Sequence, residues 1–120
     1  MIKLLLSIIY ITLILSAIAN AEIVKCDDFT NSIVKSKCFL NKGVSLQSLK
    51  KYQVAAEQYR YGIKSIGADY NTNMKFIDDT GMKLTLANIE FEKGNFKVSM
   101  NLYSGVLTSR ITMAEDSAKL

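Results

Sequence analysis

The stretch NIEFEKGNFKVSMNLYSGVL, residues 88–107, sets the interpretation of the whole chain. At its centre stands Gly94-Asn95, a pair typical of the turn that ends a helix. After this turn, apolar and small residues recur every three or four positions, as they do along one face of an amphipathic helix. The stretch therefore predicts a helical hairpin, in which a short turn joins two antiparallel helices.

A weaker copy of this pattern precedes it in the chain. Tyr52 aligns with Phe96 and Tyr59 with Tyr103, in both cases at a spacing of 44 residues (96 − 52 and 103 − 59). The shared order is aromatic, small, apolar, aromatic, apolar. Small residues let two helices approach closely, and aromatic rings fill the groove to a neighbouring unit. Two hairpins of similar construction are therefore expected.

The fold class predicted from the sequence is all-α. The chain has no proline, and the residue alternation typical of strands is scarce. Helices are expected over residues 38–49, 52–66, 81–93 and 96–107. Gly67 is expected to end the second of these helices, and residues 108–120 are expected to fray. The segment 22–36 is expected to form a strap or a short helix.

The helix expected over residues 81–93 is apolar on more than one side. Its apolar residues are Met82, Leu84, Leu86, Ala87, Ile89 and Phe91. A surface helix usually has a single apolar stripe, so a helix that is apolar on two sides is expected to lie between two neighbours.

The N-terminus has the organisation of a secretory signal peptide. A basic head at residues 1–3 precedes the apolar segment 4–19, and Ala19-Asn20-Ala21 has the small residues that signal peptidase requires. Cleavage is expected before Glu22, which leaves a single exported domain, periplasmic or secreted, over residues 22–120. The alternative is an uncleaved anchor, although the apolar run is shorter than the roughly 20 residues that span a bilayer.

The two cysteines, Cys26 and Cys38, are expected to form a disulfide that pins the N-terminal segment to the domain. An even pair of cysteines in a small exported domain is typically oxidised. One continuous helix would separate the two residues by about 18 Å, so the chain must turn between them if the bond forms. The alternative is a pair of buried free thiols.

The charge distribution argues against nucleic acid as a partner. The exported part has 14 basic and 11 acidic residues, a net charge of +3 (14 − 11), and residues 22–66 hold eight of the basic against four of the acidic residues. This mild excess indicates a preference for acidic partners or anionic surfaces, or simply a solvated lysine-rich face. A membrane is expected as a partner only if the signal segment is retained.

The sequence contains no set of residues that indicates catalysis. The chain has no histidine, which removes the usual imidazole base and most zinc sites. The acidic pairs Asp27-Asp28 and Asp78-Asp79 are adjacent in the chain, so their side chains point apart on a helix and serve better as caps. We therefore expect a non-enzymatic protein without a cofactor or a metal site.

The two predicted hairpins resemble the tetratricopeptide repeat, a helix-turn-helix unit that stacks into arrays. The resemblance covers two repeat-like units, residues 39–66 and 80–107, which are 44 residues apart instead of the family's usual 34 or so. The residues that carry it in the first unit are Phe39, Gly43, Leu46, Tyr52, Ala55, Tyr59 and Ile63. Those that carry it in the second are Leu84, Leu86, Ala87, Asn88, Lys93, Gly94, Asn95, Phe96, Ser99, Tyr103, Val106 and Leu107. An irregular helical bundle is the alternative.

The resemblance implies a partner-binding groove lined by the first helix of each unit. The implied lining residues are Leu40, Val44, Gln47, Leu84, Asn88 and Phe91. Such a groove would bind a segment of another protein, as in an adaptor or assembly factor of an envelope or secretion complex. The alternatives are that these residues simply pack within the domain, or that the protein inhibits an enzyme or toxin through the Asn-rich insert at residues 70–79.

Overall fold

The structure, a computed structural model, describes residues 25–70 and 79–119 of the chain. These residues form one short 3₁₀ helix and four α-helices, and the two ranges contain no strand. The elements are η1 (Cys26–Asp28), α2 (Ser32–Ser48), α3 (Tyr52–Tyr70), α4 (Asp79–Glu92) and α5 (Phe96–Ala118). The all-α prediction is confirmed for this part of the chain.

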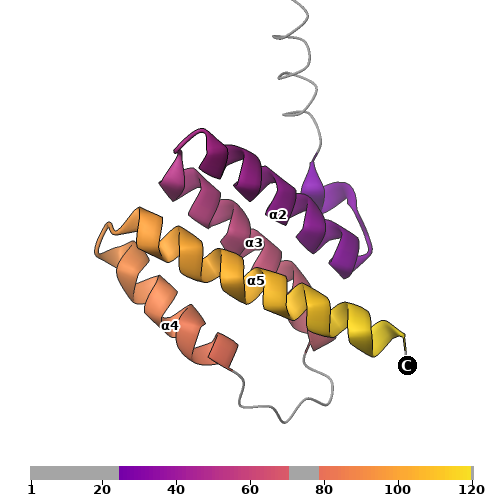
Figure 1. The fold of residues 1–120 in the computed structure, drawn as a ribbon. Coiled ribbons are helices and arrows are strands. Elements are labelled where there is room, and N and C mark those ends of the chain that lie inside the picture. Colours follow the sequence, from indigo (N-terminus) through magenta and orange to yellow (C-terminus); the bar gives the residue numbers. More distant parts are fainter. Residues whose placement is uncertain (1–24, 71–78, 120) are drawn as a thin grey trace, which may run out of the picture.

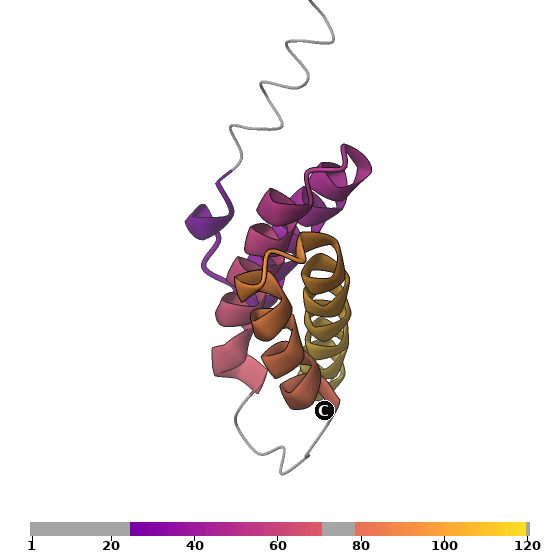
Figure 2. The same ribbon diagram turned by 90° about the vertical axis from the view of Figure 1, so that its left-hand side faces the viewer.

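The four α-helices form two antiparallel hairpins, α2–α3 and α4–α5, whose turns lie at the same end of the molecule (Figure 1). The helix at the centre is α5, because it packs against α2, α3 and α4. The first helices of the two hairpins, α2 and α4, make no extensive contact with one another. Figure 2 shows η1 outside the bundle, on the side of the first hairpin.

The core lies mainly between α3 and α5. Every apolar side chain of the buried core cluster except Ala87 comes from one of these two helices. The α3 members are Ala55, Ala56, Tyr59, Ile63 and Ile66, and the α5 members are Met100, Tyr103, Val106, Leu107, Ile111 and Ala114. Apart from one adjacent pair in each helix, both sets repeat at intervals of three and four residues, which places each set on one face of its helix.

Small residues allow each first helix to approach its partner. A Cβ atom on Gly43 of α2 would lie 2.3 Å from Cε1 of the Tyr59 ring, so glycine is required at this crossing. In the second hairpin, Ser99 is fully buried and donates a hydrogen bond to the carbonyl oxygen of Ala87 at 2.9 Å. Ser36 makes a similar bond in the first hairpin, to the carbonyl oxygen of Gly62 at 3.1 Å.

The two hairpin turns have the same geometry. The amide of Lys51 donates to the carbonyl of Leu46 at 3.0 Å, and 44 residues later (90 − 46) the amide of Asn95 donates to the carbonyl of Glu90 at 2.9 Å. Lys50 and Gly94 hold the left-handed conformation that this helix-ending motif requires, with φ of 59° and 82°. Both predicted turns are therefore confirmed.

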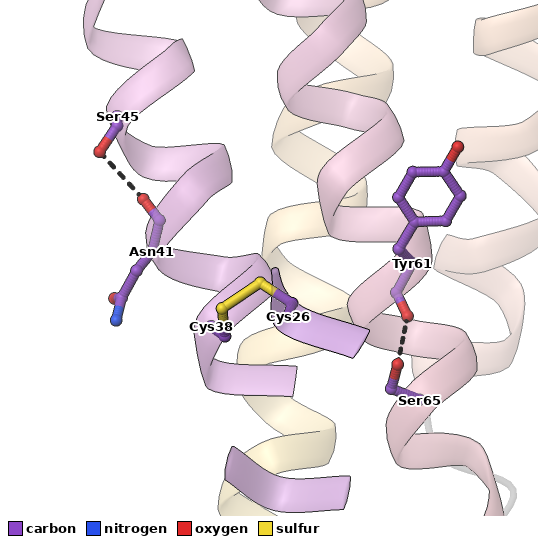
Figure 3. Close-up of a disulfide and its surroundings, with 6 residues drawn as sticks. All are labelled: Cys26, Cys38, Asn41, Ser45, Tyr61 and Ser65. Carbon is purple, nitrogen blue, oxygen red and sulfur yellow. Dashed lines mark hydrogen bonds between the residues drawn. A yellow bond between two sulfur atoms is a disulfide. The ribbon is translucent and has the colours of Figure 1, made fainter. Parts of the chain in front are cut away.

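The disulfide between Cys26 and Cys38 is also confirmed, and the chain turns between the two residues as expected. Their Cα atoms are 5.5 Å apart, although Cys26 belongs to η1 and Cys38 to α2. Asn31 starts α2 by accepting a hydrogen bond from the amide of Val34 at 3.1 Å, which is a typical N-cap. Figure 3 shows the bond on the part of α2 that faces Tyr61 and Ser65 of α3.

Three helix boundaries differ by more than about two residues from the sequence-based expectation. The Asn31 cap starts α2 at Ser32, six residues before the expected start at residue 38 (38 − 32). Gly67 does not end α3, which continues to Tyr70; the glycine does not adopt the positive φ of a C-terminal cap. The last helix extends to Ala118 because Ile111 and Ala114 are buried in the core and hold its C-terminal turns.

None of the helices in the two described ranges is long and apolar enough to span a bilayer. The predicted signal peptide and its cleavage site lie outside the described residues. So does most of the predicted insert, residues 71–78.

Candidate functional site

The three predicted lining residues of α2 lie in different environments. Leu40 is partly buried and packs against the core cluster, whereas Val44 is half exposed. Gln47 is exposed, and its Oε1 accepts a hydrogen bond at 2.8 Å from the hydroxyl of Tyr59. Only Val44 and Gln47 therefore offer surface to a partner.

The three predicted lining residues of α4 mostly face the domain itself. Leu84 and Phe91 are partly buried and pack against the core cluster. The Phe91 ring lies edge-on to Phe96 at 5.1 Å, and the guanidinium of Arg60 lies 4.8 Å from its centroid. Asn88 is exposed, and its Oδ1 accepts a hydrogen bond from the hydroxyl of Tyr103.

The six residues do not form one continuous surface. Those of α2 and those of α4 belong to helices that make no extensive contact with each other. Each set is instead tied to its own hairpin by a tyrosine: Tyr59 holds Gln47, and Tyr103 holds Asn88. A part in partner binding stays a prediction for these residues.

The two tyrosine hydroxyls are held in the neutral form. Burial is the main cause that raises the pKa of Tyr59, and a hydrogen bond with Ser104 partly opposes it. Burial also raises the pKa of Tyr103, against the opposing effect of the Arg60 guanidinium and of a hydrogen bond with Ser99. Neutral phenols bonded to amide side chains hold the hairpins together and offer no base at neutral pH.

The most distinctive surface of the described chain is the outer face of α4, defined here as Met82, Leu86 and Ile89. These three apolar side chains are 75%, 47% and 46% exposed. Their spacing of four and three residues puts them on one stripe of the helix. The opposite side of α4, with Leu84, Ala87 and Phe91, packs on the core. The helix is therefore apolar on two sides, but the described residues cover only one of them.

The groove implied by the family resemblance does not include this face. The signal was nevertheless present in the sequence, because the expected helix carried apolar residues on two sides and was predicted to lie between two neighbours. One neighbour is α5. No other described element covers the outer face.

The described residues do not indicate a metal site. No group of three or more His, Cys, Asp or Glu side chains in residues 25–70 and 79–119 is placed to hold a metal ion. Comparisons with protein-family models, with curated proteins and with solved structures give no match to this chain. The function is therefore inferred from the geometry of the molecule alone.

Proposed function

We propose that the protein is an exported, non-enzymatic interaction module that binds a helix of another protein on the outer face of α4. In this role it would serve as an adaptor or assembly factor of an envelope or secretion complex. The proposal includes the tetratricopeptide-like character of the two hairpins, because modules of this kind use stacked helices as docking surfaces.

The observation that carries the proposal is the exposure of Met82, Leu86 and Ile89 on one stripe of a well-formed helix. Single exposed apolar residues are common, but a stripe of three on one helix face is the pattern of a helix that is sandwiched on both sides. Methionine suits such a surface because its flexible thioether adapts to the shape of a partner.

The partner that fits this face best is an amphipathic helix. A stripe with i, i+4 and i+7 spacing offers one ridge about 10 Å long, which matches two turns of a second helix. The charged residues Lys83 and Glu90 are seven positions apart on α4 and lie on the same side of the stripe. A helix with charges of both signs beside its apolar face would match them. The disulfide between Cys26 and Cys38 agrees with a site of action in an oxidising compartment.

The proposal is tested by site-specific photo-crosslinking in intact cells. A photoreactive residue placed at position 86 should link the protein to a single partner, and mass spectrometry of the product identifies the segment bound. The binding of that purified segment to the exported protein is then measured by titration. Leu86→Glu should weaken binding by about tenfold or more, because it places a charge in an apolar contact.

Val44→Glu is the matched control, since it makes the same kind of change at an exposed apolar residue of α2. It should leave binding within a factor of about two, as expected for a residue outside the contact. Circular dichroism of both variants checks that the helices are intact. If Val44→Glu abolishes binding and Leu86→Glu does not, the partner binds to α2 and the proposal is wrong.

A further inference from the structure

A second candidate site lies beside the disulfide and includes no residue of α4. It is a pocket of about 580 Å³ between the N-terminal strap, α2 and α3, and we call it the strap pocket. The residues that line it are Lys25, Cys26, Asp27, Phe39, Lys42, Gln58, Tyr61, Lys64 and Ser65. Its volume falls within the range of roughly 300–1,000 Å³ that is usual for ligand sites.

The base of the strap pocket is apolar. Cys26 and Phe39 are 2% and 7% exposed, and the Phe39 ring lies 5.7 Å from that of Tyr61 at an angle of 48°. This ring pair connects α2 to α3, and Figure 3 shows Tyr61 on α3 across from the disulfide. A side chain or ring of a ligand would therefore find apolar contacts at the base.

The rim of the strap pocket is basic. Lys25 comes from the strap, Lys42 from α2 and Lys64 from α3, so each of the three elements contributes one lysine to the lining. None of them forms an ion pair within the described part of the chain, whereas Lys37 pairs with Glu115 at 2.7 Å. Asp27 is the single acidic residue in the lining.

The disulfide builds one wall of this pocket. It holds η1 against α2, and η1 with the preceding residue contributes Lys25, Cys26 and Asp27 to the lining. Without the bond, the strap would lose its cross-link to α2. Three of the eight basic residues in the segment 22–66 line this pocket, and none of the three belongs to α4.

We propose that the strap pocket binds an acidic peptide segment whose carboxylates flank an apolar side chain. The apolar side chain would contact Phe39 and Tyr61, and the carboxylates would pair with Lys25, Lys42 and Lys64. Gln58 and the hydroxyl oxygen of Ser65, which already donates to the Tyr61 carbonyl at 2.9 Å, can accept hydrogen bonds from the peptide backbone. A flat anionic membrane would reach the lysines but not the recessed base, so the shape favours a peptide.

The test uses the exported protein with its disulfide formed and the peptide acetyl-Glu-Glu-Phe-Glu-Glu-amide as the probe. Calorimetric titration at low salt should detect binding that the same peptide with Gln for every Glu does not show. The double substitution Lys42→Gln with Lys64→Gln should weaken binding by about tenfold, as expected for the loss of two ion pairs at a partly enclosed site. The matched control, Lys83→Gln with Lys93→Gln, removes the same charge from α4 and the turn that follows it, and should change the affinity by less than about twofold.

Two further variants separate a direct contact from a folding defect. Asp27→Asn should tighten binding, because it removes the one carboxylate among the described lining residues, and a gain in affinity cannot result from misfolding. The double substitution Cys26→Ser with Cys38→Ser should release the strap and weaken binding, while circular dichroism still reports the helices.

Several outcomes would overturn the proposal. If the Glu and Gln peptides bind with equal affinity, the lysines do not recognise the carboxylates. If Lys83→Gln with Lys93→Gln weakens binding as much as Lys42→Gln with Lys64→Gln does, the effect reflects only the net charge of the protein. Binding to vesicles of phosphatidylglycerol with none to the peptide assigns the lysines to a lipid surface. Because the outer face of α4 is unchanged in the pocket variants, this result and that of the crosslinking experiment are independent.

Discussion

The two hairpins have the same turn but different surroundings. At equivalent positions, Lys50 and Gly94 adopt the left-handed conformation, and the same hydrogen bonds close both turns. The first helix of the first hairpin, α2, contacts α3 and α5 and is joined to η1 by the disulfide. The first helix of the second hairpin, α4, packs extensively on α5 alone.

The comparison separates what a local sequence determines from what the neighbours determine. A turn depends on a few consecutive residues, and it is retained even where lysine replaces glycine at the left-handed position. The environment of a helix depends on the elements around it, and there the hairpins differ. The first hairpin has an N-terminal strap, whereas the second has an exposed apolar stripe in the described structure.

The largest effect on stability should come from removing the disulfide, which only the first hairpin has. Cys26→Ser with Cys38→Ser opens a disulfide with a sequence separation of 12 and should lower the free energy of unfolding by about 3 kcal/mol. Urea unfolding followed by circular dichroism measures the change. Reduction of the unmodified protein with dithiothreitol should give a similar loss, and a loss of less than about 1 kcal/mol in both cases would show that the strap adds little to stability.

The next effect concerns the helix crossing at which the two hairpins use different small residues. Gly43→Ala places a methyl group against the ring of Tyr59, which is fully buried and cannot move aside, so the expected loss is about 2 kcal/mol. Gly105→Ala is the matched control, because a Cβ atom there meets nothing within 4 Å. It should leave stability unchanged or raise it by up to about 1 kcal/mol. Similar unfolding midpoints for the two variants would contradict the close packing at Gly43.

A smaller effect tests the equivalence of the two turns. Gly94→Ala should cost about 1 kcal/mol, since alanine is strained in the left-handed conformation. Lys50→Gly should add about 0.5 kcal/mol, because the relief of strain exceeds the entropy lost by glycine. Lys51→Gly, at the neighbouring position without a positive φ, should give no gain. Thermal unfolding shows whether each variant gains or loses stability. If Lys51→Gly stabilises the protein as much as Lys50→Gly does, the gain does not come from relief of the left-handed conformation at Lys50.

The smallest predicted effect is a loss of stability that is absent at neutral pH and occurs only at alkaline pH. The unfolded chain releases its tyrosine protons near the ordinary pKa of about 10, whereas burial raises the pKa of Tyr59 and Tyr103 in the folded protein. The unfolded state then binds fewer protons, so stability falls as the pH rises above about 10. Tyr59→Phe and Tyr103→Phe should each reduce this decline, as measured by urea unfolding at a series of pH values. A decline as steep as that of the parent protein in both variants would assign it to other groups.

Much of the fold could be predicted from the sequence because it depends on local patterns. The Gly94-Asn95 turn, the apolar face of α3 and the bridging of Cys26 to Cys38 follow from short-range signals, and the structure contains all three. The continuation of α3 beyond Gly67 could not be predicted, since a glycine ends a helix only when its backbone adopts a positive φ.

The candidate surfaces depend on packing and were harder to predict. The implied groove assumed that α2 and α4 are neighbours, but α5 is the helix that packs on α2 and α3. The sequence did indicate that α4 is apolar on two sides, although it could not show which side remains uncovered. The strap pocket combines residues from three elements, so no single stretch of sequence carries its pattern.

The position of α4 at the edge of the bundle has a consequence for motion. Of its residues from Thr80 to Glu92, only Thr80 and Ala87 are buried, and its extensive packing is on a single neighbour. A helix with so few buried contacts opens locally at a lower free energy than the rest of the fold. Its amide protons should exchange with deuterium sooner than those of α3 and α5. A protein bound to its outer face would slow that exchange, so a partner would be visible as a change in the rate at which one helix opens.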